Sequence, residues 1–258
     1  MSTEISDLNL RIWRGDSSGG DHVSYQVPVR EGMVVLDAVL WVQANLASDL
    51  AVRWNCKAAK CGSCSAEVDG FPRLMCKTPI SEYGSTVSVR PMKSFPVIKD
   101  LVTDVSWNYE VNREIPPFTP SEKDLKTSEP WRMQQSDVER SMEFRKCIEC
   151  FLCQDVCHVV REHPKTFFYG PRLMIRIAGL EMHPKDTLDR RPLLKGKAGL
   201  GYCNITKCCT EVCPEHIKIT DNAIIPLKER MDDVYFDPVR AVARMFRGKP
   251  RDANQEEA

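Results

Sequence analysis

The residues of this chain whose types and spacing could do chemistry are its twelve cysteines, in 258 residues. They form three groups: Cys56, Cys61, Cys64 and Cys76; Cys147, Cys150, Cys153 and Cys157; and Cys203, Cys208, Cys209 and Cys213. Disulfides are rare in a reducing cytosol, so thiols in this number indicate metal ligation more often than cross-linking. The spacing within each group decides which centre is expected.

The first group has four, two and eleven residues between its cysteines. The first two intervals match the plant-type 2Fe-2S spacing, in which a loop wraps the cluster and a distant fourth thiolate closes the site. Small residues such as Gly62 suit this loop because they let backbone N-H groups approach the sulfurs. A thioredoxin-like redox pair of Cys61 and Cys64 would leave Cys56 and Cys76 without a role. We therefore predict a 2Fe-2S cluster on all four.

The second group has two, two and three residues between its cysteines, which is the spacing of a bacterial ferredoxin run. Its thiolates can bind separate irons of a cubane, but they are too crowded for the usual two-pair arrangement around one zinc ion. In two-cluster modules the fourth cysteine of such a run ligates the other cluster. We therefore expect Cys157 to cross over to a second cluster.

The third group supplies the returning ligand, because Cys213 is followed by Pro214 as the fourth cysteine of a ferredoxin run usually is. The predicted ligands of a 4Fe-4S cluster are Cys147, Cys150, Cys153 and Cys213. Three thiolates remain for a 3Fe-4S cluster, those of Cys157, Cys203 and Cys209. Cys208 adjoins Cys209 and is expected to be a small buried hydrophobe. If it ligates instead, the third cluster is a second 4Fe-4S.

The elements around the cysteines differ before and after a boundary near residues 105–112. Before it, residues 8–14 and 23–29 predict a hairpin, residues 35–46 a helix, and residues 86–91 a last strand. After it, residues 136–146, 170–182, 221–234 and 237–247 read as helices. The two later cysteine groups resemble halves of one duplicated module.

These patterns predict an α+β protein whose N-terminal plant-type, ubiquitin-like 2Fe-2S ferredoxin domain precedes a mainly α-helical, bacterial-ferredoxin-like two-cluster domain. The predicted segments are a 2Fe-2S domain at 1–108, a connector at 109–135, a helical domain at 136–247 and a disordered tail at 248–258. Residues 107–130 are rich in proline and charge and predict an extended conformation.

Charge and hydropathy exclude several classes of function. Thirty-six basic residues balance thirty-six acidic ones, which argues against a nucleic-acid partner. The N-terminal residues carry neither a secretory nor a mitochondrial import pattern. No run approaches the ~18 apolar residues of a membrane span, so we expect a cytosolic chain whose membrane contact runs through a partner or a surface helix.

The chain resembles the iron-sulfur subunit of succinate dehydrogenase and fumarate reductase, respiratory complex II. The resemblance rests on the loop that ends in CGSC at Cys64, on CIECFLCQDVC at 147–157 and on CNITKCCTEVCP at 203–214. It implies electron transfer from the FAD of a flavoprotein subunit, through 2Fe-2S, 4Fe-4S and 3Fe-4S clusters, to an integral membrane anchor and quinone. It also implies a peripheral subunit at the cytoplasmic face of a bacterial inner membrane, with no catalytic residue of its own.

The chain departs from that family where a quinone would bind. His158 follows Cys157 where family members generally have proline, and the segment VVREHPKTFF at 159–168 lacks the tryptophan of the family's quinone pocket. His158 is a candidate neighbour of a quinone or of a cluster; the alternative is a surface or helix-packing histidine. A fumarate reductase or another flavin-linked reductase, including a thiol-coupled one, is the alternative to a succinate dehydrogenase. A zinc-stapled scaffold or nucleic-acid binder is a more distant alternative.

Overall fold

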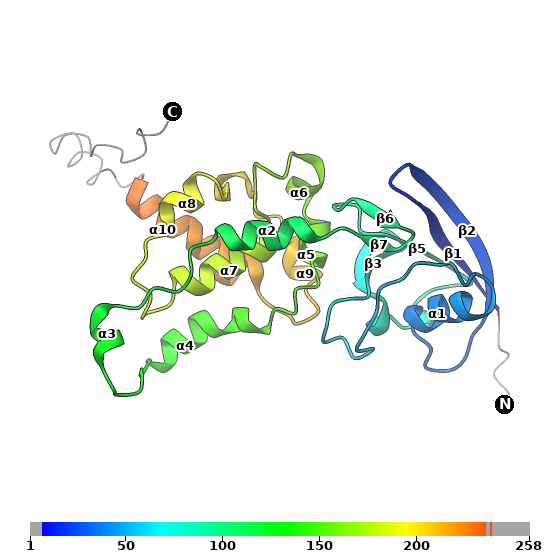
Figure 1. The fold of residues 1–258 in the computed structure, drawn as a ribbon, viewed down its shortest axis with the longest axis horizontal. Coiled ribbons are helices and arrows are strands. Elements are labelled where there is room, and N and C mark those ends of the chain that lie inside the picture. Colours follow the sequence, from blue (N-terminus) through cyan, green and yellow to red (C-terminus); the bar gives the residue numbers. More distant parts are fainter. Residues whose placement is uncertain (1–6, 236–237, 239–258) are drawn as a thin grey trace.

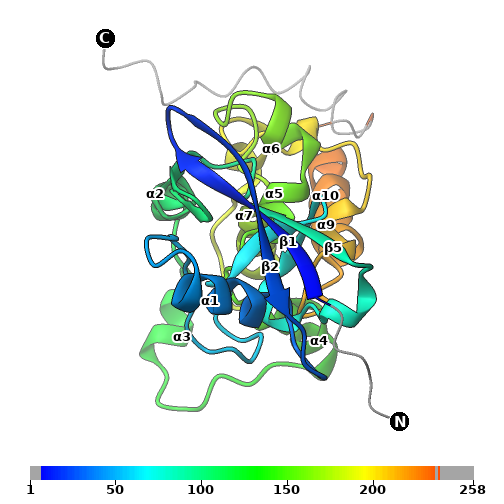
Figure 2. The ribbon, with the colours of Figure 1, turned by 90° about the vertical axis from the view of Figure 1, so that its right-hand side faces the viewer.

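In the computed structural model, residues 7–235 and residue 238 are described. Figure 1 shows two lobes side by side along the longest axis, with the strands in one lobe and helices α2 to α10 in the other. Figure 2 views the molecule from the strand end. The predicted order, an N-terminal mixed domain followed by a helical one, is confirmed. The predicted helix at 237–247 and the predicted tail at 248–258 lie outside the described residues, apart from residue 238.

The first lobe is a mixed sheet that α1 (Val35–Asn45) covers. Its strands run in the order β4-β3-β5-β1-β6-β7, and β2 also pairs with β1. The strand bounds are β1 Asp7–Asp16, β2 Gly19–Pro28, β3 Ser65–Val68, β4 Phe71–Leu74, β5 Thr86–Arg90, β6 Val97–Lys99 and β7 Val102–Thr103. Two short 3-10 turns, η1 (Met75–Lys77) and η2 (Ile80–Glu82), separate β4 from β5.

The long hairpin is present and tighter than the sequence predicts, because β1 and β2 extend up to a two-residue turn at 17–18. Alternate residues of β1, namely Leu8, Leu10 and Ile12, point into the core, which is the period of a strand with one buried face. β1 also pairs in parallel with β5, so the strand before the first cysteine loop and the strand after it are neighbours.

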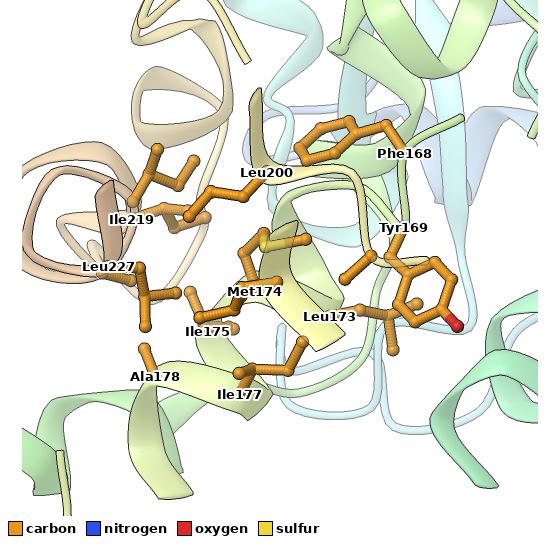
Figure 3. Packing of buried hydrophobic residues seen from close by; sticks show 14 of the residues in the cluster. Phe168, Tyr169, Leu173, Met174, Ile175, Ile177, Ala178, Leu200, Ile219 and Leu227 are labelled. Atoms are coloured by element: carbon orange, nitrogen blue, oxygen red, sulfur yellow. The ribbon is translucent and has the colours of Figure 1, made fainter. Parts of the chain in front are cut away.

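The second lobe is built around α7 (Pro171–Glu181). Pro171 occupies the first turn of α7, where its fixed φ suits a helix start. Figure 3 shows the packing of α7 residues against Phe168, Leu200, Ile219 and Leu227. The other helices are α2 Ser106–Glu114, α3 Glu122–Lys126, α4 Gln135–Met142, α5 Leu152–Val156, α6 His158–Glu162, α8 Arg191–Lys195, α9 Cys208–Glu211 and α10 Ile225–Tyr235. Shorter turns are η3 Glu143–Lys146, η4 Leu200–Tyr202 and the π-helical η5 Ile219–Ile224. None of the helices described is long and apolar enough to cross a bilayer.

The prediction of an extended conformation at 107–130 is wrong for α2 and α3. α2 turns a buried face toward the helical lobe, and that face carries Asn108 as well as Val111. The side chain of Asn108 accepts a hydrogen bond of 2.9 Å from Gln154 Nε2. A buried asparagine interrupts the apolar period, so the periodicity alone does not reveal this helix.

A buried ionic cluster joins the two lobes. Glu67 of β3 and Asp155 of α5 are both fully buried, and Arg161 of α6 pairs with Glu67 at 2.8 Å and with Asp155 at 3.6 Å. Arg90 and Lys93 contribute further cations at 3.7 and 3.5 Å from Glu67. Burial and the adjacent Glu67 carboxylate raise the pKa of Asp155 to about 6. Arg161 is therefore the cation that holds two buried carboxylates from different lobes together.

Replacing Arg161 tests how much this cluster holds the lobes together. We expect Arg161→Met to destabilise the protein by ~3 kcal/mol, since removing one partner of a buried pair leaves uncompensated charge. Arg73→Met removes an exposed pair with Glu82 at 3.9 Å and is the matched control, for which we expect ~0–1 kcal/mol. The measurement is the thermal midpoint of the cluster-loaded protein. Equal midpoints for the two variants would contradict this role.

Candidate iron-sulfur centres

The first cysteine loop turns its backbone N-H groups toward its own sulfurs. Lys57, Ala59 and Gly62 have positive φ angles of 52°, 55° and 70°, so the chain coils tightly after Cys56. The backbone N-H groups of Ala58 and Lys60 each donate to Cys56 Sγ at 3.3 Å. Successive N-H groups in such turns form a concave site for negative charge. This loop therefore has the donor arrangement that a 2Fe-2S cluster requires.

The thiols of this loop lie close enough to interact with one another. Burial acts to raise the pKa of Cys61, but hydrogen bonds from Ser63 and from the Cys56 region outweigh it and lower that pKa to about 6. Burial and the adjacent Cys76 raise the pKa of Cys64 to about 12. The N-H of Cys76 donates to Cys64 Sγ at 3.5 Å, so the distant fourth cysteine closes the loop as predicted from spacing. Iron would supply the positive charge that a buried Cys64 thiolate lacks.

A second set of cysteines lines a small hollow in the helical lobe. Its thiols come from two distant parts of the chain: Cys147, Cys150, Cys153 and Cys213. Burial and neighbouring thiols raise the pKa of Cys150 to about 12, and that of Cys153 well above its usual range. Four thiols around one hollow fit a cubane, which places one thiolate on each iron.

A third set surrounds Cys157, which leaves the second run and faces the third. Burial, followed by the neighbouring thiols of Cys208 and Cys203, raises the pKa of Cys157 to about 11. The pKa of Cys209 is also raised to about 11, by burial and by the thiols of Cys208, Cys203 and Cys157. The structure thus brings together the cysteines that spacing assigns to each cluster. Which thiolate binds which iron remains our proposal.

The two cysteine runs of the helical lobe follow one backbone design. In the run that starts at Cys147, left-handed residues stand two and four positions later, at Glu149 (φ 55°) and Phe151 (φ 61°). In the run that starts at Cys203, they stand at the same offsets, at Ile205 (φ 60°) and Lys207 (φ 62°). A short helix follows in each case, α5 after Phe151 and α9 after Lys207.

This correspondence distinguishes the third site from the second. Thr206 stands at the position that Cys150 occupies in the other run, three residues after the first cysteine. Cys208 stands at the position of Leu152, which is buried and is not a ligand type. The Cys208 thiol lies 3.3 Å from the Thr206 hydroxyl. A site with three thiolates and a threonine at the fourth corner fits a 3Fe-4S cluster better than a second 4Fe-4S.

The described residues contain no group of three or more His, Cys, Asp or Glu side chains that converges on one position suited to a single metal ion. The cysteine sets are instead grouped as above. The thiolates of a cluster are divided among two or more irons, so they surround a volume and do not all meet at a point.

The first and second cysteine loops are in direct contact. A Cβ on Gly62 would lie 2.6 Å from the Cys150 Cα, so only glycine fits between the two loops. The Ser65 hydroxyl donates to the carbonyl oxygens of Gly62, at 2.8 Å, and of Cys150, at 2.9 Å. Because a single residue separates the loops, the first two predicted clusters are close neighbours.

Lysines of the first lobe strengthen this contact. Lys60 pairs with Glu215 at 3.2 Å, and Lys77 Nζ donates to the Pro214 carbonyl at 3.2 Å, both next to Cys213. The Lys60 ammonium group therefore has an acidic partner within the chain. Sequence reasoning misses Ser65, Glu67 and the contact of Gly62 with Cys150, because the partners are distant in the chain. It also misses Thr206, whose role emerges only when the two cysteine runs are compared.

His158 lies at the third site. It is the first residue of α6, directly after Cys157, and its Nε2 is 2.9 Å from Asn204 Nδ2. Asn204 adjoins Cys203. His158 therefore joins the two halves of the third cysteine set, and its contact with a cluster or a quinone remains a prediction.

Comparison with known proteins agrees with this geometry. Residues 9–110 match the family model of a 2Fe-2S iron-sulfur cluster binding domain, and residues 143–217 match that of a 4Fe-4S dicluster domain. The fumarate reductase iron-sulfur subunit of Haemophilus influenzae is 32% identical over 76% of this chain and 81% of its own length. A chain of the Mycobacterium smegmatis Sdh1 complex in the apo form is 62% identical, with a TM-score of 0.88 over 91% of this chain and 99% of that one.

A more distant relative broadens the range of activities. It is a component of the fumarate reductase (CoM/CoB) of Methanothermobacter marburgensis, and it is 32% identical over 80% of this chain. The match spans 40% of the length of that component.

Thr206→Cys tests the type of the third cluster. Because Thr206 stands where Cys150 stands in the other run, the new thiolate should complete a cubane. We expect one additional iron per chain and loss of the oxidised 3Fe-4S EPR signal. Cys208→Ser is the control and should leave both unchanged. If the signal is absent before any substitution, and Cys208→Ser creates it, Cys208 is the fourth ligand and this assignment is wrong.

Gly62→Ala tests the contact between the loops. Gly70 also has a positive φ, 81°, but nothing lies within 4 Å of a Cβ there, so Gly70→Ala controls for backbone strain. Both substitutions should lower the free energy of unfolding by ~1–2 kcal/mol, because alanine disfavours the left-handed conformation. Gly62→Ala should cost a further ~1–3 kcal/mol for the clash with Cys150. The measurement is the temperature at which the 2Fe-2S absorbance bleaches; equal losses would mean that the loops are not in contact.

Proposed function

The chain belongs to the family of iron-sulfur subunits of succinate dehydrogenase and fumarate reductase, and from this premise we propose that it takes electrons from the FAD of a flavoprotein subunit and delivers them toward an integral membrane anchor and quinone. Members of this family are electron-transfer subunits of oxidoreductase complexes. This chain binds 2Fe-2S and 4Fe-4S clusters. Its proposed complex is a succinate dehydrogenase.

The observation that carries the proposal is the unbroken succession of the three cysteine sets. The first touches the second through Gly62 and Cys150, and the second adjoins the third through Cys153 and Cys209. When bound, the clusters supply one-electron redox chemistry, with potentials set by cluster type, sulfur hydrogen bonds and burial. The chain supplies the thiolates, the N-H donors of the first loop and the apolar surroundings that exclude water.

The proposed contact with the flavoprotein lies at the first loop. Trp54 precedes Cys56 and is 44% exposed, and the ammonium group of Lys57 lies 5.0 Å from the centre of its ring. An exposed tryptophan beside a cation is typical of the central anchor of a protein interface. This surface is next to the 2Fe-2S thiols, where an electron donor must dock.

The proposed contact with the membrane anchor lies at the third site. Phe167 and Tyr202 stack at 5.4 Å and are 43% and 55% exposed, and Ile205 adds further exposed apolar surface. Tyr202 and Ile205 flank Cys203 in the sequence. Contiguous exposed apolar groups mark a surface that a partner covers. We place the anchor there and the chain, as a peripheral subunit, at the cytoplasmic face of a bacterial inner membrane.

The proposed quinone contact differs from the family pattern. His158 stands directly after Cys157, where the family has proline, and Asn204 lies beside it at the third site. Residues 159–168 contain no tryptophan. Phe167 and Tyr202 offer aromatic surface there instead. A quinone at this rim would therefore bind through a different set of side chains.

A fumarate reductase is the second candidate. It is favoured by the relatives in Haemophilus influenzae and Methanothermobacter marburgensis, both of which carry that name. The same cluster arrangement serves both directions of electron flow, so the two candidates are separated by the complex's preferred electron donor.

The function is tested by purifying the complete complex through a tag on this chain and adding succinate without oxygen. We expect a flavin-containing subunit to co-purify, and succinate to bleach the iron-sulfur absorbance. Cys56→Ser should prevent that bleaching in the 4Fe-4S cluster while leaving flavin reduction intact; Cys208→Ser is the control and should behave as the unaltered complex. Clusters that a dithiol reduces and succinate does not would support the thiol-coupled reductase. A complex without flavin would contradict the proposal.

A further inference from the structure

Arg172 is a buried cation in the wall of the second cysteine site. It is the second residue of α7, and its side chain is 9% exposed. It lines the hollow formed by Cys147, Cys150, Cys153 and Cys213, and it also lines an open groove on the outer side of that hollow. Arg172 therefore separates the site from the surface.

Its polar groups are incompletely satisfied. Nη2 forms an ion pair with Glu149, which lies between Cys147 and Cys150. Its backbone N-H donates to Gln154 Oε1 at 3.4 Å. Its Nε is buried and has no hydrogen-bond partner. A buried donor without a partner is destabilising, so the position of Arg172 calls for an acceptor beside it.

The guanidinium already acts on the thiols. Arg172 lines the same hollow as Cys147, Cys150, Cys153 and Cys213, and a cation beside thiolates stabilises their negative charge. The same electrostatics favours any additional negative charge in the hollow. Glu149 acts in the opposite direction but is 42% exposed, so solvent screens it more than it screens Arg172. The remaining carboxylate at the hollow, Glu215, is paired with Lys60.

We propose that Arg172 tunes the second cluster: its buried guanidinium, with a free Nε donor, raises the reduction potential of the 4Fe-4S cluster bound by Cys147, Cys150, Cys153 and Cys213. The inference rests on the proposed function and its ligand set. One electron from the 2Fe-2S side adds one negative charge to the cluster, and a fixed cation in a low-dielectric wall stabilises that charge. Arg172 is a positioning and tuning residue and not a catalytic one.

The test is a redox titration of the complete complex, followed by the EPR signal of the reduced 4Fe-4S cluster. Arg172→Gln should lower the ratio of reduced to oxidised cluster at least tenfold at a fixed potential, which for one electron is a shift of the midpoint by about 59 mV or more. Arg172→Lys keeps the charge and should restore most of the difference. Glu149→Gln should shift the midpoint in the opposite direction, because it removes a negative charge.

Arg176→Gln is the matched control. Arg176 lies one turn later on α7 and lines the outer groove, but it is exposed and does not line the hollow. Its replacement should leave the midpoint unchanged. A merely structural role for Arg172 would lower cluster occupancy without moving the two midpoints in opposite directions.

Each outcome decides the proposal. The proposal is overturned if Arg172→Gln and Glu149→Gln have the same 4Fe-4S reduction midpoint as the Arg176→Gln control. If Arg172→Gln fails to retain the cluster, Arg172→Lys and Glu149→Gln decide, and an unmoved or lowered midpoint in Glu149→Gln overturns the proposal. Absence of a 4Fe-4S signal from the unaltered complex would instead contradict the ligand set and the proposed function.

Discussion

The rest of the structure depends on one constraint: buried thiols from cysteine runs about fifty residues apart must meet in the same two sites. Cys213 lies with the run at 147–153, and Cys157 lies with the run at 203–209. Burial raises the pKa of Cys153, Cys157 and Cys209, so these thiols stay protonated unless iron binds them, and cluster assembly and folding of the helical lobe are linked. The core around α7 and η5 holds the two runs against each other, and their shared left-handed turns give both sites the same shape.

The contact between lobes extends this constraint to the first cluster loop. Gly62 has no side chain because the Cys150 backbone occupies that space, and Ser65 fastens both loops. Glu67, two residues further along β3, is buried with Asp155 and is compensated by Arg161. β3 therefore carries both the loop contact and the ionic contact. Electron transfer between clusters in two domains needs such an interface, because domains without one are expected to move relative to each other.

The sequence allows the cysteine sets, the α+β class and the helices α4, α7 and α10 to be predicted, because cysteine spacing and helical periodicity are local signals. It does not predict α5, α6, α8 and α9, which are only four or five residues long. It does not reveal α2, whose buried face includes Asn108 bound to Gln154. Nor does it reveal Gly62, Glu67 or Arg172, since each takes its role from a residue more than twenty positions away. Thr206 becomes informative only when the two runs are compared turn by turn, because their cysteine spacings differ.

An anomalous difference map at the iron edge, from crystals of the cluster-loaded complex, tests the central claim most directly. Our account predicts three iron centres in this chain: one within the loop of Cys56, Cys61, Cys64 and Cys76, one that Cys213 shares with the run at 147–153, and one that Cys157 shares with Cys203 and Cys209. Iron bound by residues 147–157 alone, without Cys213, would contradict the exchange of thiolates on which the fold and the proposed relay depend.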